Sequence, residues 1–300
     1  MFVMDKIAIF ADIMNKLKVC VLWLCLAVAA ASCDFIERNK PLVGAIGDEL
    51  MNEMGDGDGP ESESGEAGAN AADDVELQMQ ASPEGTPEQI LRRTGYTLSY
   101  NKTTKLPNWV AWRLTADRTS GPAKRDGVDF EADTDVPAPR AEDSDYYGSG
   151  YDRGHMCPAA DNKFSKKAMQ ESFLFTNMCP QNGNLNRGDW NEMEMACRGW
   201  AEKYGCVYVV CGPVLYKGKH KTIGKNKVVV PEAFFKVVLR LGDKPEAIGF
   251  IYKNAEGNRP KGDYVNTVDE VERITGIDFF PSLPDDVERR VEASADIGKW

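Results

Sequence analysis

The chain of 300 residues carries a formal net charge of −11, and one segment holds the excess of acids. Residues 34–90 contain 15 acids and 2 bases, whereas residues 91–300 contain 30 acids and 31 bases. The near-neutral C-terminal part excludes binding of a polyanion through overall charge, so such binding would require a local cluster of bases. A lysine-rich stretch is one candidate, and a solvated loop between strands explains it equally well: Lys217, Lys219, Lys221, Lys225 and Lys227.

The first 33 residues have the pattern of a secretory signal. Lys16 and Lys18 precede an apolar run, residues 19–31, that is too short to span a membrane. The run ends in small residues followed by Cys33, as in a bacterial lipobox. We therefore expect export, lipidation of Cys33 and anchoring in the bacterial cell envelope, with Met14 as a candidate true start. An uncleaved membrane-anchoring helix is the alternative.

Residues 34–90 are predicted to be a disordered acidic linker. They contain a single aromatic residue, Phe35, and runs of Gly, Asp, Glu and Ser. Such a composition cannot bury enough apolar surface to offset the entropy of the chain. Residues 91–300 carry the aromatic and β-branched residues of a core and are predicted to form one globular domain.

Five cysteines lie in the predicted domain. Export would place them in an oxidising compartment, and their odd number means that at least one stays free or pairs between molecules. Cys206 and Cys211 are five apart on a predicted strand and should face opposite sides of a sheet. A structural zinc site is not expected, because no C-x-x-C occurs and the chain has two histidines. The pairing is left open among Cys157, Cys179, Cys197, Cys206 and Cys211.

In chain order, the hydrophobic pattern predicts an α+β domain with a central, mostly antiparallel sheet and packed helices. Residues 96–100 and 109–114 are predicted to pair as strands, and residues 115–150 to form a long loop that contacts substrate. An amphipathic helix is expected over residues 186–204, followed by a buried strand at 206–211 that Gly212-Pro213 ends. Further elements are predicted as a helix near 163–171, strands at 228–230, 234–241 and 247–252, and closing helices at 268–275 and 285–293.

Two motifs carry the candidate chemistry, and the first is Asp152-Arg153-Gly154-His155. A neutral imidazole accepts a proton from water near pH 7, so His155 is a candidate general base. Arg153 supplies a cation for a phosphate. A lone histidine is more often structural or exposed, and we interpret the other one, His220, as a surface residue. The motif around His155 reverses those odds.

The second motif runs from Asn177 to Gln181 and continues with Asn186, Trp190, Glu194 and Arg198. The last four are spaced by four residues, which predicts one stripe of a single helix. An amide oxygen supplemented by water suits a hard, octahedral ion such as Mg²⁺, with Mn²⁺ as the alternative. For Glu194 and Arg198 taken alone, an ordinary surface ion pair is the better explanation. Together, the motifs supply the parts for hydrolysis of a phosphodiester with one metal ion.

These motifs resemble those of the DNA/RNA non-specific endonuclease family. Its members are ββα-metal nucleases and include secreted sugar-non-specific nucleases and mitochondrial endonuclease G. The resemblance runs from about Tyr96 to Phe280 and includes Gly212-Pro213 and Phe235-Lys236-Val237. The fold that it implies contains a ββα-metal catalytic motif within the α+β domain.

The resemblance also implies a role for each motif residue. His155 would be the general base, Asn186 the sole direct protein ligand of the metal, and Glu194 a residue that binds water of the metal. The other implied roles are transition-state stabilisation by Arg153 and Arg198, substrate contact by Gln181 and by a further arginine that we match to Arg125, and a catalytic role for Asn177, which shapes the site together with Gln181. Cys157 and Cys179 depart from the family pattern and raise the options of a disulfide bracing the site or of redox sensitivity.

The leading hypothesis is a lipid-anchored, Mg²⁺-dependent endonuclease that cuts DNA and RNA with little sequence preference. The alternatives are a catalytically weak surface lipoprotein that binds nucleic acid, and a surface lipoprotein with a structural or adhesive role. Phosphate contacts carry no direct sequence information, and no recognition helix or base-stacking platform is evident. The oligomeric state and the face of the membrane remain open.

Overall fold

A computed structural model of the chain describes residues 75–300. The predicted signal, Cys33 and most of the predicted linker lie outside the described residues. Within the described part, no helix is both long enough and apolar enough to cross a membrane.

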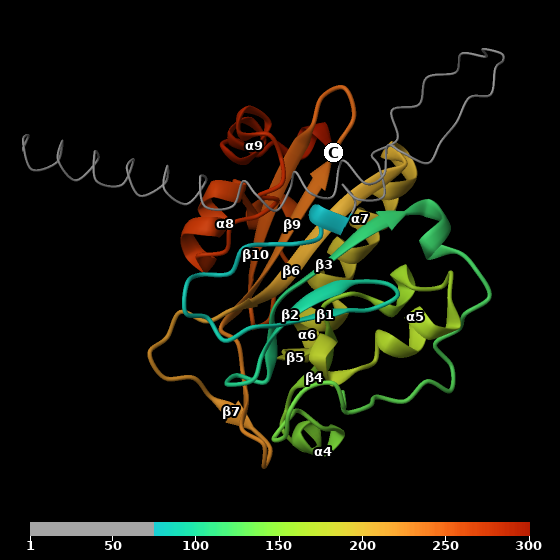
Figure 1. Ribbon diagram of the computed structural model, residues 1–300, viewed down its shortest axis with the longest axis vertical. Coiled ribbons are helices and arrows are strands. Elements are labelled where there is room, and N and C mark those ends of the chain that lie inside the picture. Colours follow the sequence, from blue (N-terminus) through green and yellow to red (C-terminus); the bar gives the residue numbers. More distant parts are fainter. Residues whose placement is uncertain (1–74) are drawn as a thin grey trace, which may run out of the picture. The chain divides into compact units, whose positions relative to one another are not determined.

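The centre of the fold is a seven-stranded sheet in which every neighbouring pair is antiparallel (Figure 1). This confirms the predicted α+β class and the predicted pairing of the first strands. The strands, in their order across the sheet, are β1 (Gln89–Arg92), β2 (Thr97–Asn101), β3 (Leu106–Thr115), β6 (Cys206–Val214), β9 (Ala233–Arg240), β10 (Glu246–Lys253) and β11 (Val265–Asn266).

The two faces of the sheet belong to two separate hydrophobic cores, because side chains alternate along a strand. On β6, Val209 and Cys211 face the core that holds helix α7 (Asp189–Tyr204), whereas Tyr208 and Val210 face the other core. Cys206 packs against this second core, so the predicted opposite facing of Cys206 and Cys211 is confirmed. Helices α8 (Val268–Thr275) and α9 (Asp285–Glu292) cover the second face (Figure 1).

Strand β6 does not end at Gly212-Pro213, as the sequence led us to expect. It continues to Val214 along β9, after β3 has stopped pairing with it at Cys211. Pro213 is tolerated because a strand with one remaining neighbour can lack an N–H on its open side.

A smaller hairpin and two helices lie against the first face. β4 (Asp152–His155) pairs with β5 (Met178–Gln181), and α6 (Gly183–Arg187) and α7 follow directly. The helix predicted over residues 186–204 is therefore two helices, which meet at Gly188. A side chain at Gly188 would place its Cβ 2.7 Å from the carbonyl oxygen of Asn184, so the chain can turn here only with glycine.

The packed part begins before residue 91, and the predicted boundary falls inside β1. Leu77 is buried, the backbones of Ala81 and Asp278 pair, and the Trp109 indole N–H donates to the Ser82 hydroxyl at 3.1 Å. The sequence analysis assigned these residues to the linker because the acidic composition of the whole segment masked the few apolar residues that pack. The remaining described elements are α4 (Asp143–Tyr146), α5 (Lys166–Glu171), β7 (Thr222–Ile223), β8 (Val228–Val229) and the short 3-10 helices η1 (Ala116–Thr119), η2 (Ala159–Asp161), η3 (Phe175–Asn177), η4 (Lys261–Tyr264) and η5 (Ile297–Lys299).

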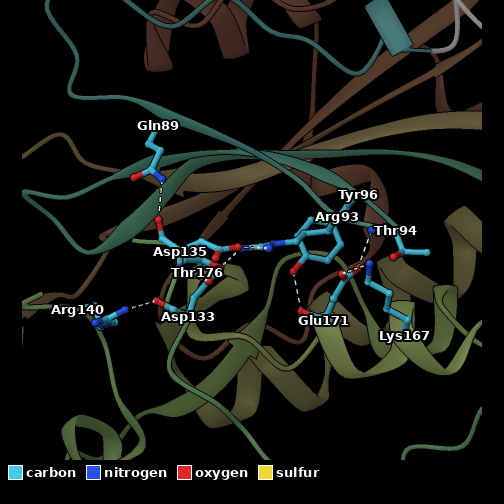
Figure 2. Close-up of polar contacts among 10 residues, drawn as sticks. All are labelled: Gln89, Arg93, Thr94, Tyr96, Asp133, Asp135, Arg140, Lys167, Glu171 and Thr176. Atoms are coloured by element: carbon cyan, nitrogen blue, oxygen red, sulfur yellow. Dashed lines mark hydrogen bonds and ion pairs between the residues drawn. The ribbon is translucent and has the colours of Figure 1, made fainter. Parts of the chain in front are cut away.

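The long loop between β3 and β4 is fastened to the sheet by a buried aspartate. Asp133, 3% exposed, accepts hydrogen bonds at 2.6 Å from the Arg93 guanidinium and from the Thr176 hydroxyl (Figure 2). Arg140 donates to the Asp133 carbonyl oxygen at 2.8 Å. The Nη1 nitrogen of Arg93 donates to the carboxylate of Asp135. The segment predicted as a loop is thus held in place at residues 133–140.

Candidate active site

A cleft of about 770 Å³ opens beside the β4–β5 hairpin. Three stretches of chain line it, namely residues 121–126 of the long loop, residues 153–169 and residues 186–198 of α6 and α7. Its lining contains six lysine and arginine side chains and two carboxylates, although the domain as a whole is nearly neutral. The bases are Lys124, Arg125, Arg153, Lys163, Arg187 and Arg198, and the acids are Asp126 and Glu194.

His155, the last residue of β4, lines this cleft, and its ring packs against two aromatic side chains that also contact each other. The ring centroids of Phe173 and Phe130 lie 5.0 and 5.7 Å from that of the imidazole. Nε2 is buried and has no hydrogen-bond partner within the described part of the chain. Burial and the nearby charge of Arg125 lower the pKa of His155 to about 3. The imidazole is therefore neutral at physiological pH and holds a lone pair for a proton.

Arginines from different elements reach the cleft beside His155. Arg125 comes from the long loop and lies over the Phe173 ring at 5.4 Å. Arg153 forms an ion pair with Asp143 and lies over the Phe130 ring at 5.2 Å. Both predicted arginines thus lie in the cleft with His155, and the matching of Arg125 across the loop is consistent with the structure.

Asn186 presents its amide oxygen to the cleft because the amide nitrogen is engaged elsewhere. Its Nδ2 donates to a carboxylate oxygen of Asp152 at 3.0 Å, and the same oxygen accepts from Arg187 at 2.9 Å. Since Asp152 holds the N–H₂ group, the amide oxygen is the atom left for a ligand. Asp152, the first residue of the motif that contains His155, therefore sets the orientation of Asn186.

Glu194 and Arg198 lie in the cleft from α7, and the surface ion pair between them that we considered does not form. Arg198 instead donates to Asp161 at 3.0 Å, and Asp161 is fully buried and also accepts from the Trp112 indole at 3.1 Å. Burial raises the pKa of Glu194 to about 7, and the buried ammonium of Lys236 opposes that rise. The predicted single stripe is wrong for Asn186, which lies on α6, yet the turn at Gly188 still brings it to the same cleft.

Asn177 and Gln181 do not line the cleft, and the predicted contact roles are corrected here. The Asn177 side chain is fully buried; it accepts from the Cys157 N–H at 2.9 Å and donates to the Cys157 and Ser172 carbonyls. It clamps the chain that leaves β4, so it is a positioning residue. Gln181 is also fully buried and packs beneath Gly154, where a Cβ would come within 2.3 Å of its amide oxygen.

The cysteines near the site are free thiols and form no bracing disulfide. Cys157 and Cys179 are buried, and burial raises the pKa of both thiols. Because the thiolate is the reactive form, neither group is activated for oxidation in the folded state. Cys197 and Cys211 are free thiols as well.

The sequence alone missed several residues of the site. Lys124, Lys163 and Arg187 line the cleft although they lie outside both motifs, and buried Asp161 holds Arg198 from behind it. The lysine-rich stretch at 217–227 does not line it. His220 is part-buried and lies 3.0 Å from Glu232, away from the cleft.

Strands β4 and β5 lead into helices α6 and α7, with His155 on the first strand and the Asn186 carboxamide just before α7. This arrangement defines a ββα-metal type of site. A sequence model of the DNA/RNA non-specific endonuclease family matches residues 76–286, and the chain belongs to this family.

The relatives are named nucleases. The chain is 40% identical over 210 residues to mitochondrial nuclease EXOG of Danio rerio, which covers 63% of this chain and 60% of that protein. It is 36% identical over 221 residues to nuclease C1 of Cunninghamella echinulata var. echinulata, which covers 68% and 88%. A crystal structure of the EndoG/EndoGI complex superimposes with a TM-score of 0.62 at 31% identity, covering 65% of this chain and 86% of that one. The chain spans about 60% of the length of the EXOG relatives.

Proposed function

We propose that the chain is a divalent-metal-dependent endonuclease that hydrolyses phosphodiester bonds in DNA and RNA without sequence preference. The observation that carries this proposal is the cleft itself. Its lining includes His155, whose Nε2 has no hydrogen-bond partner among the described residues, together with Asn186 and arginines from three stretches of chain. Family membership and the names of the relatives support the same reaction.

The residues present suit a hard divalent cation, which we take to be Mg²⁺. The Asn186 amide oxygen would be the direct ligand, and the Glu194 carboxylate on the next helix would hold water of the ion. A cation bound there would neutralise charge on the phosphate and on the leaving oxygen. A single amide ligand leaves most of the coordination shell to water and substrate, as Mg²⁺ prefers.

The side chains of the protein perform the remaining steps. His155 accepts the proton of the attacking water through a ring nitrogen that its surroundings keep unprotonated. Arg153 and Arg198 contact the phosphate, and their carboxylate partners, Asp143 and Asp161, fix the two guanidinium groups in place. Preorganised cations of this kind stabilise the charge that develops in the transition state.

The lining of the cleft supports action on both nucleic acids. No phenylalanine, tyrosine or tryptophan lines the cleft within the described residues, so no platform for base stacking is present there. The lysines and arginines of the lining address phosphate oxygens, which occur in every sequence and in both sugars.

Digestion by the purified full-length chain tests this proposal. Supercoiled plasmid and a structured RNA, incubated in one buffer with Mg²⁺, should both be cut, and excess EDTA should stop both reactions. Full activity in EDTA would contradict the metal dependence. Binding of both nucleic acids without cleavage would support the alternative of a weakly catalytic binding protein.

We further propose that the enzyme is exported and lipid-anchored in the bacterial cell envelope through Cys33. The lipobox-like end of the apolar run supports this. Cys33→Ser should move the protein from the detergent phase to the aqueous phase in Triton X-114 partitioning. A wild-type chain found wholly in the aqueous phase would refute the anchor.

A further inference from the structure

Three carboxylates meet between α8 and α9, on the face of the sheet opposite the cleft. Asp269 and Glu272 lie one turn apart on α8, and Glu292 is the last residue of α9. One oxygen of each lies within 4.8 Å of the others. That span is about twice the distance between calcium and its oxygen ligands, so one ion can reach all three side chains.

Glu292 is the residue that the fold leaves unexplained. It is 6% exposed, and its Oε1 has no hydrogen-bond partner among the described residues, while its carboxylate points into the cluster. A buried carboxylate without a partner is costly. Its place at the C-terminal end of a helix adds an unfavourable interaction with the helix dipole.

No described lysine or arginine offsets this charge. None of the ion pairs formed within residues 75–300 involves Asp269, Glu272 or Glu292. Repulsion among these groups would disappear if a cation lay between them.

We propose that Asp269, Glu272 and Glu292 form a second, structural metal site that takes Ca²⁺ and is separate from the catalytic site. Three carboxylates give an all-oxygen, strongly anionic donor set, which suits a hard cation. The ion joins the end of α9 to the start of α8 and thereby fastens both helices over the second core. This role is structural, so cleavage does not pass through it.

Thermal unfolding of the full chain with Ca²⁺ alone tests the site. The measurement is made in an Asn186→Ala background, which removes the amide ligand of the catalytic cleft. The unfolding midpoint should rise saturably from EDTA to CaCl₂, and Ca²⁺ at a hundred times its Kd should shift the unfolding equilibrium about 100-fold. No rise in this background would overturn the proposal.

Substitutions then locate the response. Glu292→Gln should abolish the Ca²⁺-dependent rise, because it removes the buried charge and keeps the shape. The matched control is Glu270→Gln on α8, the helix that carries Asp269 and Glu272. Its exposed carboxylate pairs with Arg273 outside the cluster, so this variant should keep the full rise. If Glu292→Gln does not fold, exposed Asp269→Asn decides, with an expected loss of at least tenfold in Ca²⁺ affinity by titration calorimetry. An undiminished response in either variant would refute the site.

Discussion

The chemical environment of His155 depends on residues that are distant from it in the sequence. The motif around it identified a candidate base from sequence. The aromatic walls and the nearby guanidinium come from Phe130, Phe173 and Arg125, which lie up to 30 positions away and are brought together only by folding. The lowered pKa of the imidazole is therefore a property of the fold that no local pattern could predict.

This burial has a consequence for stability. In the unfolded chain the imidazole has its ordinary pKa of 6.5, whereas folding lowers that pKa to about 3. The unfolded state therefore binds more protons between these values, and the wild type should lose stability as pH falls through that window. We expect the difference in unfolding midpoint between wild type and His155→Ala to shift against the wild type from pH 7 to pH 4. A difference independent of pH would contradict the buried neutral imidazole.

Lys236 is a second residue whose role the sequence did not reveal. Its ammonium is fully buried, lacks a hydrogen-bond partner within residues 75–300, and lies 4.1 Å from the centre of the Trp190 ring. It is also the largest electrostatic influence that favours the ionised form of Glu194.

Lys236→Met should therefore fold, because a buried charge replaced by an apolar side chain of similar size is often tolerated. Without this ammonium the pKa of Glu194 rises further, so cleavage should fall more at pH 6 than at pH 8.5. A pH–rate profile of the folded variant measures this. An equal loss at all pH values would assign Lys236 a purely structural role.

At the scale of elements, the sequence predicted the long helices and strands, whereas it did not show the short strands β4 and β5 or the junction between α6 and α7. The recurrence of Trp190, Met193, Cys197 and Trp200 correctly indicated a helix packed on the sheet. The spacing by four also extended that helix back to Asn186, because periodicity does not register a backbone turn at a single glycine. Gly188 carries that turn, and it aims Asn186 from α6 into the cleft.

Gly188→Ala tests this junction against a matched control. The new Cβ would collide with the Asn184 carbonyl oxygen, so we expect lower stability and a higher Mg²⁺ concentration for half-maximal cleavage. Gly199 lies within α7, and a Cβ there would meet open space. Gly199→Ala should therefore raise the free energy of unfolding by about 0.5–1 kcal/mol and leave the Mg²⁺ dependence normal. Chemical denaturation and Mg²⁺ titration compare the two. Equal behaviour would show that the turn does not position Asn186.

The two aspartates that bind Arg93 allow a second comparison, which tests how the long loop is anchored. Arg93 holds two aspartates, of which Asp133 is buried and Asp135 is 59% exposed. Asp133→Asn should cost at least about 2 kcal/mol of unfolding free energy, because it weakens a buried charged hydrogen bond. Asp135→Asn should cost less than about 1 kcal/mol. Similar costs in urea denaturation would mean that Asp133 does not anchor the loop.

For the molecule as a whole, composition and motif gave the class of fold and the chemistry, whereas the charge of the site came from topology. Residues 91–300 are nearly neutral, and the sequence offered the lysines at 217–227 as one candidate basic cluster, which a solvated loop explains equally well. The fold instead gathers six bases from three separate stretches into one cleft. These bases come together because of the way the strands and helices pack, and hydrophobic periodicity does not reveal which elements become neighbours.

The two faces of the sheet carry different candidate sites. One face of the sheet carries α6, α7 and the cleft, and the other carries α8, α9 and the carboxylate cluster. The sheet thus separates the candidate active site from the carboxylate cluster.

The central claim is that His155 activates water in this cleft, and a comparison of the two histidines tests it most directly. The measurement is the rate of plasmid cleavage in Mg²⁺ by wild type, His155→Ala and His220→Ala, each verified as folded by circular dichroism. His155→Ala should lose about 10²–10⁴-fold, the usual contribution of a general base, and His220→Ala should stay within about twofold of wild type. A folded His155→Ala variant that cleaves at the wild-type rate would contradict the account.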